Sequence, residues 1–150
     1  MSEEPELLAE PGDWPDRLIT GGGRVLDSDA LSDFATIRTV YTQTLTWFAV
    51  DHGVVLAVPA AALAAAWPTS AAQREVLNVL LSLPVTVIDP LDDAAATGMG
   101  ELLAANTGVA PDVVAAHVAY SARRRGWPVV TTRPERLRAL VPDLEIEYLP

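Results

Sequence analysis

The residues best suited to chemistry in this sequence are acids next to short apolar segments. Asp27 and Asp29 directly follow segment 24–26, which is typical of a buried strand. A further acid, Asp112, opens segment 111–133, which predicts a helix, a tight glycine turn and a buried strand that ends in polar residues. Sites in open parallel sheets lie at the carboxyl ends of the strands, and carboxylate oxygens are ligands of hard divalent cations. The sequence therefore predicts an acidic site at that edge of a sheet.

The balance of charge limits the partners that the protein can attract. Twenty acidic and ten basic side chains give a net charge of -10, which by itself repels a polyanion such as RNA. All ten basic residues are arginines, and six of them lie between Arg123 and Arg138. This cluster is either a positive recognition patch or a solvated helix end that complements the helix dipole. The lack of lysine argues against a phosphorylation-controlled receiver domain, and the lack of cysteine excludes thiolate metal sites.

Apolar segments of strand length alternate with segments of helical period along most of the chain. Helices are expected at 28–52, 59–67, 70–83, 91–105, 111–125 and 134–140. Strands are expected at 24–26, 54–58, 85–88, 128–131 and 144–148, the last as an edge strand because apolar and acidic residues alternate in it. This order predicts an α/β protein: a three-layer α/β/α domain around a central, mostly parallel five-stranded sheet.

The first 23 residues differ in composition from the rest. Residues 1–23 are acidic, contain three prolines and end in three glycines, which predicts an N-terminal arm ahead of a single domain at 24–150. The longest charge-free apolar run, 54–67, has about 14 residues, fewer than the roughly 20 that a membrane helix needs. We therefore expect a cytoplasmic protein with no membrane association.

Three segments in order carry a resemblance to a known family. They are VLDSDAL at 25–31, VPAAALAAAW at 58–67 and DVVAAHVAYSARRRGWPVVTTRPERL at 112–137. Together they make the chain, over about residues 24–149, similar to the PIN-domain family, and most of all to the bacterial VapC-type toxins. The resemblance implies a PIN-like fold and a metal-dependent ribonuclease in which acids at the strand ends hold Mg²⁺ or Mn²⁺. Such a cation activates a water and neutralises charge on the phosphate that is cleaved.

The resemblance also implies four acidic positions, of which this sequence retains one. Asp27 occupies the first. The second, third and fourth fall on Ala65, Ala115 and Arg133, so the nuclease site is predicted to be degenerate. Asp112 lies one helical turn before Ala115, and is either a second ligand of a reduced site or an ordinary aspartate at the start of a helix. Asp29 and Glu101 are weaker candidates, each expected as a cap or surface residue.

Two functions follow as expectations. The first is a catalytically inactive PIN-like binding or regulatory module, in which the Arg133 guanidinium takes the place of the metal and pairs with Asp27. The second is an active Mg²⁺- or Mn²⁺-dependent ribonuclease that uses Asp27 and Asp112, with RNA as a partner only in that case. The resemblance implies a homodimer and an antitoxin-like protein partner in either case. His117 has no recognisable nucleophile near it and is expected in the core or at an interface.

Overall fold

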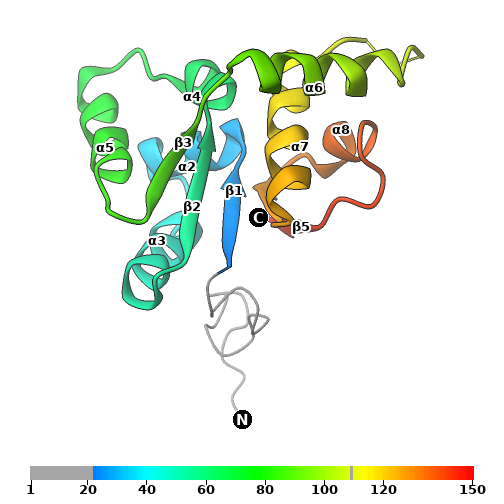
Figure 1. Ribbon diagram of the computed structural model, residues 1–150. Helices are drawn as coiled ribbons and strands as arrows, with labels where there is room; N and C mark the ends of the chain where they lie inside the picture. The colour runs from blue at the N-terminus through cyan, green and yellow to red at the C-terminus, as the bar shows by residue number, and fades with distance from the viewer. Residues whose placement is uncertain (1–21, 109) are drawn as a thin grey trace.

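The computed structural model describes residues 22–108 and 110–150, where five strands and seven helices alternate (Figure 1). In chain order these are β1 (Gly23–Leu26), α2 (Ser28–Thr36), α3 (Tyr41–His52), β2 (Val55–Pro59), α4 (Ala60–Ala66), α5 (Ala71–Leu81), β3 (Thr86–Asp89), α6 (Asp93–Ala104), α7 (Val113–Arg125), β4 (Val129–Thr131), α8 (Pro134–Arg138) and β5 (Ile146–Tyr148). Within these residues, no helix is both long and apolar enough to cross a membrane.

The five strands form one parallel sheet in the order β3-β2-β1-β4-β5. At its centre, Val25 of β1 pairs with Ala57 of β2 on one side and with Val129 of β4 on the other. Because parallel crossovers are right-handed, the reversal of direction after β3 puts α7 on the opposite face from α2 and α3, as Figure 1 shows. The predicted three-layer α/β/α architecture is confirmed, with a sheet that is parallel throughout.

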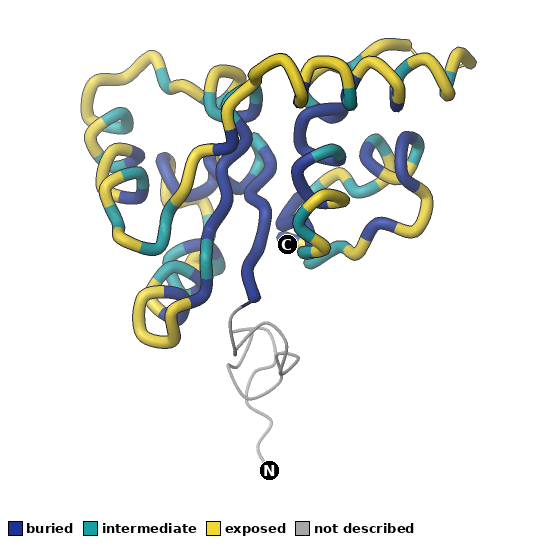
Figure 2. Tube along the Cα trace, viewed as in Figure 1, coloured by how far each residue is buried: buried dark blue, intermediate teal, exposed yellow. Residues whose placement is uncertain are grey.

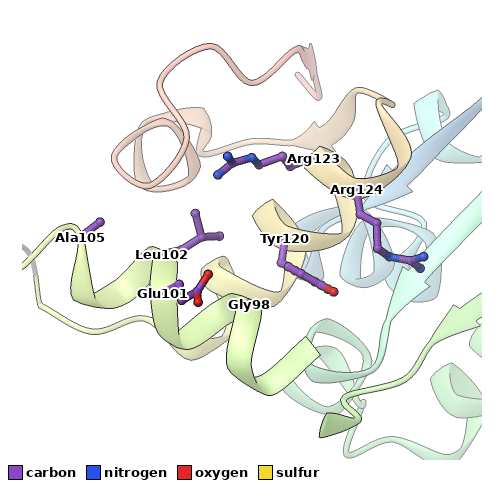
Figure 3. Close-up of a pocket in the computed structure, with 7 residues that line it drawn as sticks. All are labelled: Gly98, Glu101, Leu102, Ala105, Tyr120, Arg123 and Arg124. Atoms are coloured by element: carbon purple, nitrogen blue, oxygen red, sulfur yellow. The ribbon is translucent and has the colours of Figure 1, made fainter. Parts of the chain in front are cut away.

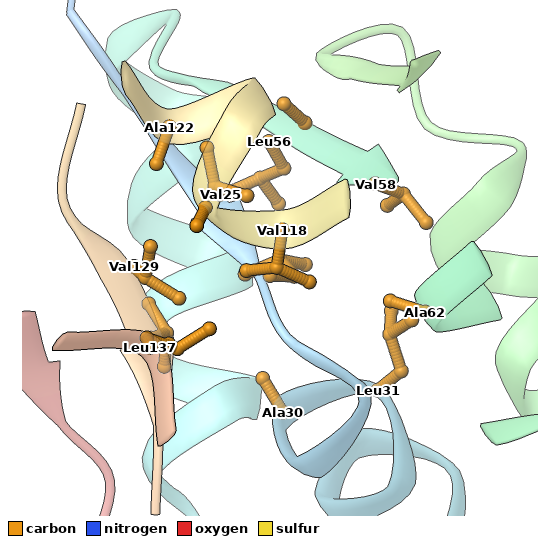
Figure 4. Packing of buried hydrophobic residues seen from close by; sticks show 14 of the residues in the cluster. Val25, Ala30, Leu31, Leu56, Val58, Ala62, Val118, Ala122, Val129 and Leu137 are labelled. Carbon is orange, nitrogen blue, oxygen red and sulfur yellow. The ribbon is translucent and has the colours of Figure 1, made fainter. Parts of the chain in front are cut away.

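The core lies between the central strands and the helices on either face (Figure 4). Fully buried side chains of the three central strands include Val25, Leu56, Val58, Val129 and Val130. Each such side chain contributes about 1.5–3 kcal/mol when removed from water. β1 is buried along its whole length, whereas α6 is largely exposed (Figure 2). The carboxyl ends of β1 and β4 are therefore surrounded by buried side chains of the core.

The single helix expected at 28–52 is wrong, because the chain forms α2 and α3 with a break between them. α2 ends at Ile37, which has a left-handed backbone with a φ of 52°, a conformation that costs a β-branched residue free energy. The buried Asp33 carboxylate compensates by accepting hydrogen bonds from Thr39 (2.9 Å) and Thr42 (2.7 Å). The stripe of apolar residues is therefore interrupted, and the Ile37 side chain is exposed.

The predicted N-terminal arm falls almost wholly on residues 1–21, outside the described residues. Gly23, which the sequence analysis assigned to the arm, is already part of β1. The Trp127 ring packs directly against its α-carbon, because a β-carbon at Gly23 would come within 2.6 Å of that ring. The start of the sheet is thus packed against the turn that follows α7.

β5 is an edge strand as expected, but its two faces are not one buried and one charged. Tyr148 is exposed, whereas the Glu147 side chain is largely buried. Glu147 pairs with the buried Arg24 of β1 and accepts a hydrogen bond from the Tyr41 hydroxyl of α3. Burial and the Glu147 charge raise the pKa of Tyr41, so its hydroxyl stays protonated and donates. Polar contacts, in addition to the sheet, hold the last strand on the body.

Candidate functional site

Asp27 lies at the carboxyl end of β1 with a fully buried side chain. Asp27, and not Asp29, is the N-cap of α2, and it accepts a hydrogen bond from the Ser28 amide at 2.7 Å. The Thr131 hydroxyl, at the end of β4, donates to the other carboxylate oxygen at 2.6 Å. Adjacent parallel strands thus place a donor and an acceptor together at one edge of the sheet, where the sequence predicted the site.

Arg136 of α8 also binds the Asp27 carboxylate. Its Nη2 atom contacts both oxygens of Asp27, at 2.6 and 2.7 Å. Its Nη1 atom contacts Asp112 Oδ2 at 3.2 Å. Asp112 is also the N-cap of α7, because its other oxygen accepts a hydrogen bond from the Ala115 amide at 2.9 Å. One guanidinium therefore bridges the first acid of the site and the acid at the start of α7.

Arg133 pairs with Asp29, which corrects the expectation that it pairs with Asp27. Its Nε and Nη2 atoms lie 3.1 and 2.7 Å from the two oxygens of Asp29, and the Thr132 hydroxyl donates to the same carboxylate at 2.5 Å. Burial alone would raise the pKa of Asp29, but the bonds from Arg133 and Thr132 outweigh it and lower that pKa to about 2. The paired carboxylate in turn raises the pKa of the Arg133 guanidinium.

The two alanine positions add no ligand to this edge of the sheet. Ala65 is exposed on α4, and Ala115 is fully buried on α7. Glu101, the weakest of the candidate acids, lies exposed on α6 in a groove away from this cluster. Of the candidates from the sequence, the structure brings together Asp27, Asp112, Asp29 and Arg133.

The groups at this edge do not fit a resident divalent cation. A hard cation needs several free carboxylate or carbonyl oxygens, but both oxygens of Asp27 are already bound by Arg136. Among the described residues, no three His, Cys, Asp or Glu side chains are placed to hold a metal ion. The positive charge at this position is a guanidinium that the chain itself supplies.

The arginine cluster of the sequence is largely used in internal ion pairs. Arg125 binds the buried Asp89 at the end of β3 through two nitrogens, at 3.0 and 2.6 Å, and Arg124 lies 3.8 Å from it. Burial would raise the pKa of Asp89, but the Arg125 pair outweighs it and lowers that pKa. Much of the predicted recognition patch is thus neutralised within the molecule.

His117 lies in the core, as expected. Its side chain is fully buried on α7, and its Nδ1 atom accepts a hydrogen bond from the Ala61 amide of α4 at 3.2 Å. Burial lowers the pKa of the imidazole, against smaller opposing contributions from the Pro90 carbonyl and the Asp89 charge. The neutral ring thus fastens α7 to α4.

The same arrangement of elements occurs in solved structures of bacterial toxin–antitoxin complexes. One is the VapBC2 complex of Rickettsia felis bound to promoter DNA, with a TM-score of 0.64, 15% identity and coverage of 85% of this chain and 98% of that chain. Another is the DNA-bound VapBC complex of Salmonella typhimurium, with a TM-score of 0.63, 18% identity and coverage of 84% and 97%. The chain has a VapC-type PIN-domain fold.

A third solved structure is more distant. It is the VapC20 toxin of Mycobacterium tuberculosis, which cleaves the sarcin-ricin loop; the TM-score is 0.54 at 10% identity, over 71% of this chain and 87% of that chain. No family model matches the sequence, and no curated protein matches it. At such low identities the likeness establishes the fold alone.

Two residues of the site were missed at the sequence level. Arg136 was counted in the arginine cluster but given no role, although it lies three residues after Arg133 and so one helical turn further along. Thr131 was recognised only as a polar strand end. The sequence could have indicated both roles. A buried aspartate at a strand end needs hydrogen-bond donors, and the neighbouring strand and the segment after it are the nearest sources.

Proposed function

We propose that this protein is a PIN-like domain with a catalytically silent nuclease site, acting as a binding or regulatory module related to toxin–antitoxin systems. The observation that carries the proposal is the Arg136 guanidinium, which contacts both oxygens of Asp27 and also reaches Asp112. In an active PIN domain such carboxylates hold the metal. Here they hold a side chain of the same protein.

Charge and burial support this assignment. Asp27 is fully buried and the Arg136 side chain is only 16% exposed, so water screens their attraction weakly. An arginine bound through a fork of nitrogens gives fixed geometry, and its pKa is too high for it to deprotonate. A metal ion would have to displace this group and leave a buried guanidinium without its partner, which is costly. Arg136 therefore makes the fold independent of a cation at this edge.

The net charge supports the same conclusion. RNA approaching the site meets a protein of net charge -10, and the arginines nearest to Asp27 are already paired with acids. A phosphate backbone would thus find little free positive charge there. A protein partner is the better match, and we propose an antitoxin-like protein and a second copy of this chain as the partners. A light-scattering mass of the purified protein tests the homodimer.

A cleavage assay tests the silent site. Purified protein is incubated with structured and unstructured RNA in Mg²⁺ or Mn²⁺, beside the Asp27→Ala variant prepared in the same way. We expect no cation-dependent cleavage above that of the variant. Robust cleavage by the wild-type protein that Asp27→Ala abolishes would contradict the proposal.

One observation favours the alternative, a metal-dependent ribonuclease with a reduced acidic site. Three carboxylates, from Asp27, Asp29 and Asp112, surround the two arginines, and the Asp112 side chain is 43% exposed. Magnesium can be held by one or two protein carboxylates together with substrate phosphates. Under this alternative, cleavage requires Mg²⁺ or Mn²⁺ and is lost both in Asp27→Asn and in Asp112→Asn.

A further inference from the structure

Arg123 differs from most arginines of its cluster. Within residues 22–108 and 110–150, the structure gives it no acidic partner, whereas Arg125, Arg133 and Arg136 each bind an aspartate. Arg138 likewise has no acidic partner among the described residues, but its Nε donates to the Leu144 carbonyl. Arg123 is exposed near the end of α7. An unpaired guanidinium beside a hollow surface is a natural anchor for an acidic group.

The hollow beside Arg123 is a groove of about 440 Å³ between α6 and α7. Its lining includes Leu102 and Ala105 of α6 and Tyr120 of α7, and Arg123 extends from α7 toward the side on which Leu102 lies (Figure 3). Gly98 lets the Tyr120 ring lie directly on α6, because a β-carbon there would come within 2.2 Å of the ring. The groove thus combines a mainly apolar floor with positive charge on the α7 side.

A second hollow is also lined by Arg123. It has about 240 Å³, and its lining includes Trp127 and, besides Arg123, the acids Asp143 and Glu145. Trp127 in turn packs against Gly23, where the N-terminal residues join the sheet. Arg123 lines both hollows, so the hollow that contains Trp127, the neighbour of Gly23, adjoins the groove between α6 and α7 at this side chain.

We propose that residues 1–21 of the same chain dock along these two hollows and occupy the groove between α6 and α7. These residues carry six acids and a single arginine, with leucines and a tryptophan between the acids. That composition matches an apolar floor beside Arg123. The Glu101 carboxylate on the α6 side of the groove repels acids, so the acids of the arm lie on the α7 side.

The arm is long enough to make this contact. Twenty-one residues span at most about 70 Å when extended. α7, which the arm would have to follow, has 13 residues and is about 20 Å long. Docking within one chain also costs less entropy than binding a separate peptide, because the tether keeps the effective concentration high.

Disulfide trapping in the full-length chain tests the proposal, because the protein has no cysteine of its own. One cysteine is placed in the arm as Ser2→Cys, Ala9→Cys or Gly12→Cys, none of which alters an acid. The second is Ala105→Cys in the groove, or Ala72→Cys on the exposed surface of α5 as a matched control. We expect at least one arm position to form a monomeric disulfide with the groove cysteine faster than with the control.

Reversing the charge of Arg123 distinguishes specific docking of the arm from random collision of the two cysteines. Arg123→Glu is expected to slow trapping in the groove by roughly threefold to tenfold, as the loss and reversal of exposed ion pairs predicts. Arg74→Glu is the control, because the contacts of Arg74 within the described part of the chain are with the carbonyls of Pro68 and Thr69. Equal trapping at Ala105 and Ala72, a rate that Arg123→Glu leaves unchanged, or a disulfide-linked dimer as the main product would overturn the proposal.

Discussion

Two strand ends of the same sheet each carry a buried aspartate, and arginines neutralise the two carboxylates in different ways. Asp27 directly follows β1 and Asp89 is the last residue of β3. Both are buried, and each is bound through two contacts by an arginine from much later in the chain. At β3, Arg125 and the more distant Arg124 serve a single carboxylate. At β1, a single guanidinium serves two carboxylates, those of Asp27 and Asp112.

The difference shows what is particular to the β1 end. The Asp89 pair is a structural ion pair with surplus positive charge. The β1 cluster keeps the excess of acids that a cation site has, three carboxylates against Arg133 and Arg136, but satisfies the most buried one with Arg136. Under the proposed function, the guanidinium of Arg136 takes the position that a cation would need at this cluster. If the β1 cluster now stabilises the fold, as the β3 pair does, substitutions in it should change stability.

The largest effect is expected from Arg136→Met, which leaves the Asp27 carboxylate buried without its cation. Removal of one partner from a buried ion pair costs about 3–5 kcal/mol of unfolding free energy. Urea unfolding followed by circular dichroism measures it. The double variant Asp27→Asn/Arg136→Met should regain much of the loss, because no uncompensated charge remains. A change below about 1 kcal/mol, typical of a surface pair, would show that the pair holds little of the fold together.

A smaller effect is expected from Arg125→Met at the β3 end. The Arg125 side chain is 24% exposed, so water partly compensates the Asp89 carboxylate when the guanidinium is removed. The loss should be about 1.5–3 kcal/mol, the value of hydrogen bonds to charged groups. The same urea experiment measures it beside Arg136→Met. If Arg125→Met costs more than Arg136→Met, the ranking of the two strand ends is wrong.

Near the β3 end, stability should also depend on pH through His117. Its pKa in the folded protein lies below the ordinary 6.5, so the folded state binds fewer protons than the unfolded state. Stability is therefore complete above pH 6.5 and falls as the pH drops below that value. Thermal unfolding measured at several pH values from about 8 to about 5 follows this loss of stability. In His117→Asn, whose amide oxygen can still accept from Ala61, the loss should be smaller; an unchanged slope would assign it to other groups.

The smallest effect is expected at Arg133, which is 53% exposed and pairs with Asp29 at the surface. Arg133→Met should cost about 1 kcal/mol or less. Because the pKa of Asp29 is lowered from 3.8 to about 2, the pair stabilises the fold above the higher value, and its contribution is lost as the pH falls through the lower one. Acid unfolding of wild type and Arg133→Met should therefore converge at the lowest pH, and a constant difference would exclude the linkage.

The sequence was sufficient for the order of strands and for the position of Asp27 at the end of β1, because apolar periodicity and strand-end acids are local features. It was insufficient for the break between α2 and α3, where the side chain of Asp33 binds threonines six and nine residues later. It also assigned the wrong arginine to Asp27. Arg133 and Arg136 are both near β4 in sequence, and only the path of α8 decides which one turns inward. Contacts between segments that are distant in the chain determine such choices.

The burial of the Glu147 carboxylate could not be predicted from the sequence pattern either. Glu147 belongs to an alternating apolar and acidic segment that predicts a solvated charge, yet its carboxylate pairs with the buried Arg24. The pairing depends on β4 lying between β1 and β5, which is a property of the strand order.

The most direct test of the central claim is a calorimetric titration of the full-length protein with Mn²⁺. If Arg136 holds the place of the cation, the wild-type protein and Asp27→Asn should give the same negligible heat of binding. Saturable binding of Mn²⁺ to the wild-type protein that disappears in Asp27→Asn would contradict the claim, because it would mean that the carboxylates release the guanidinium to take a metal.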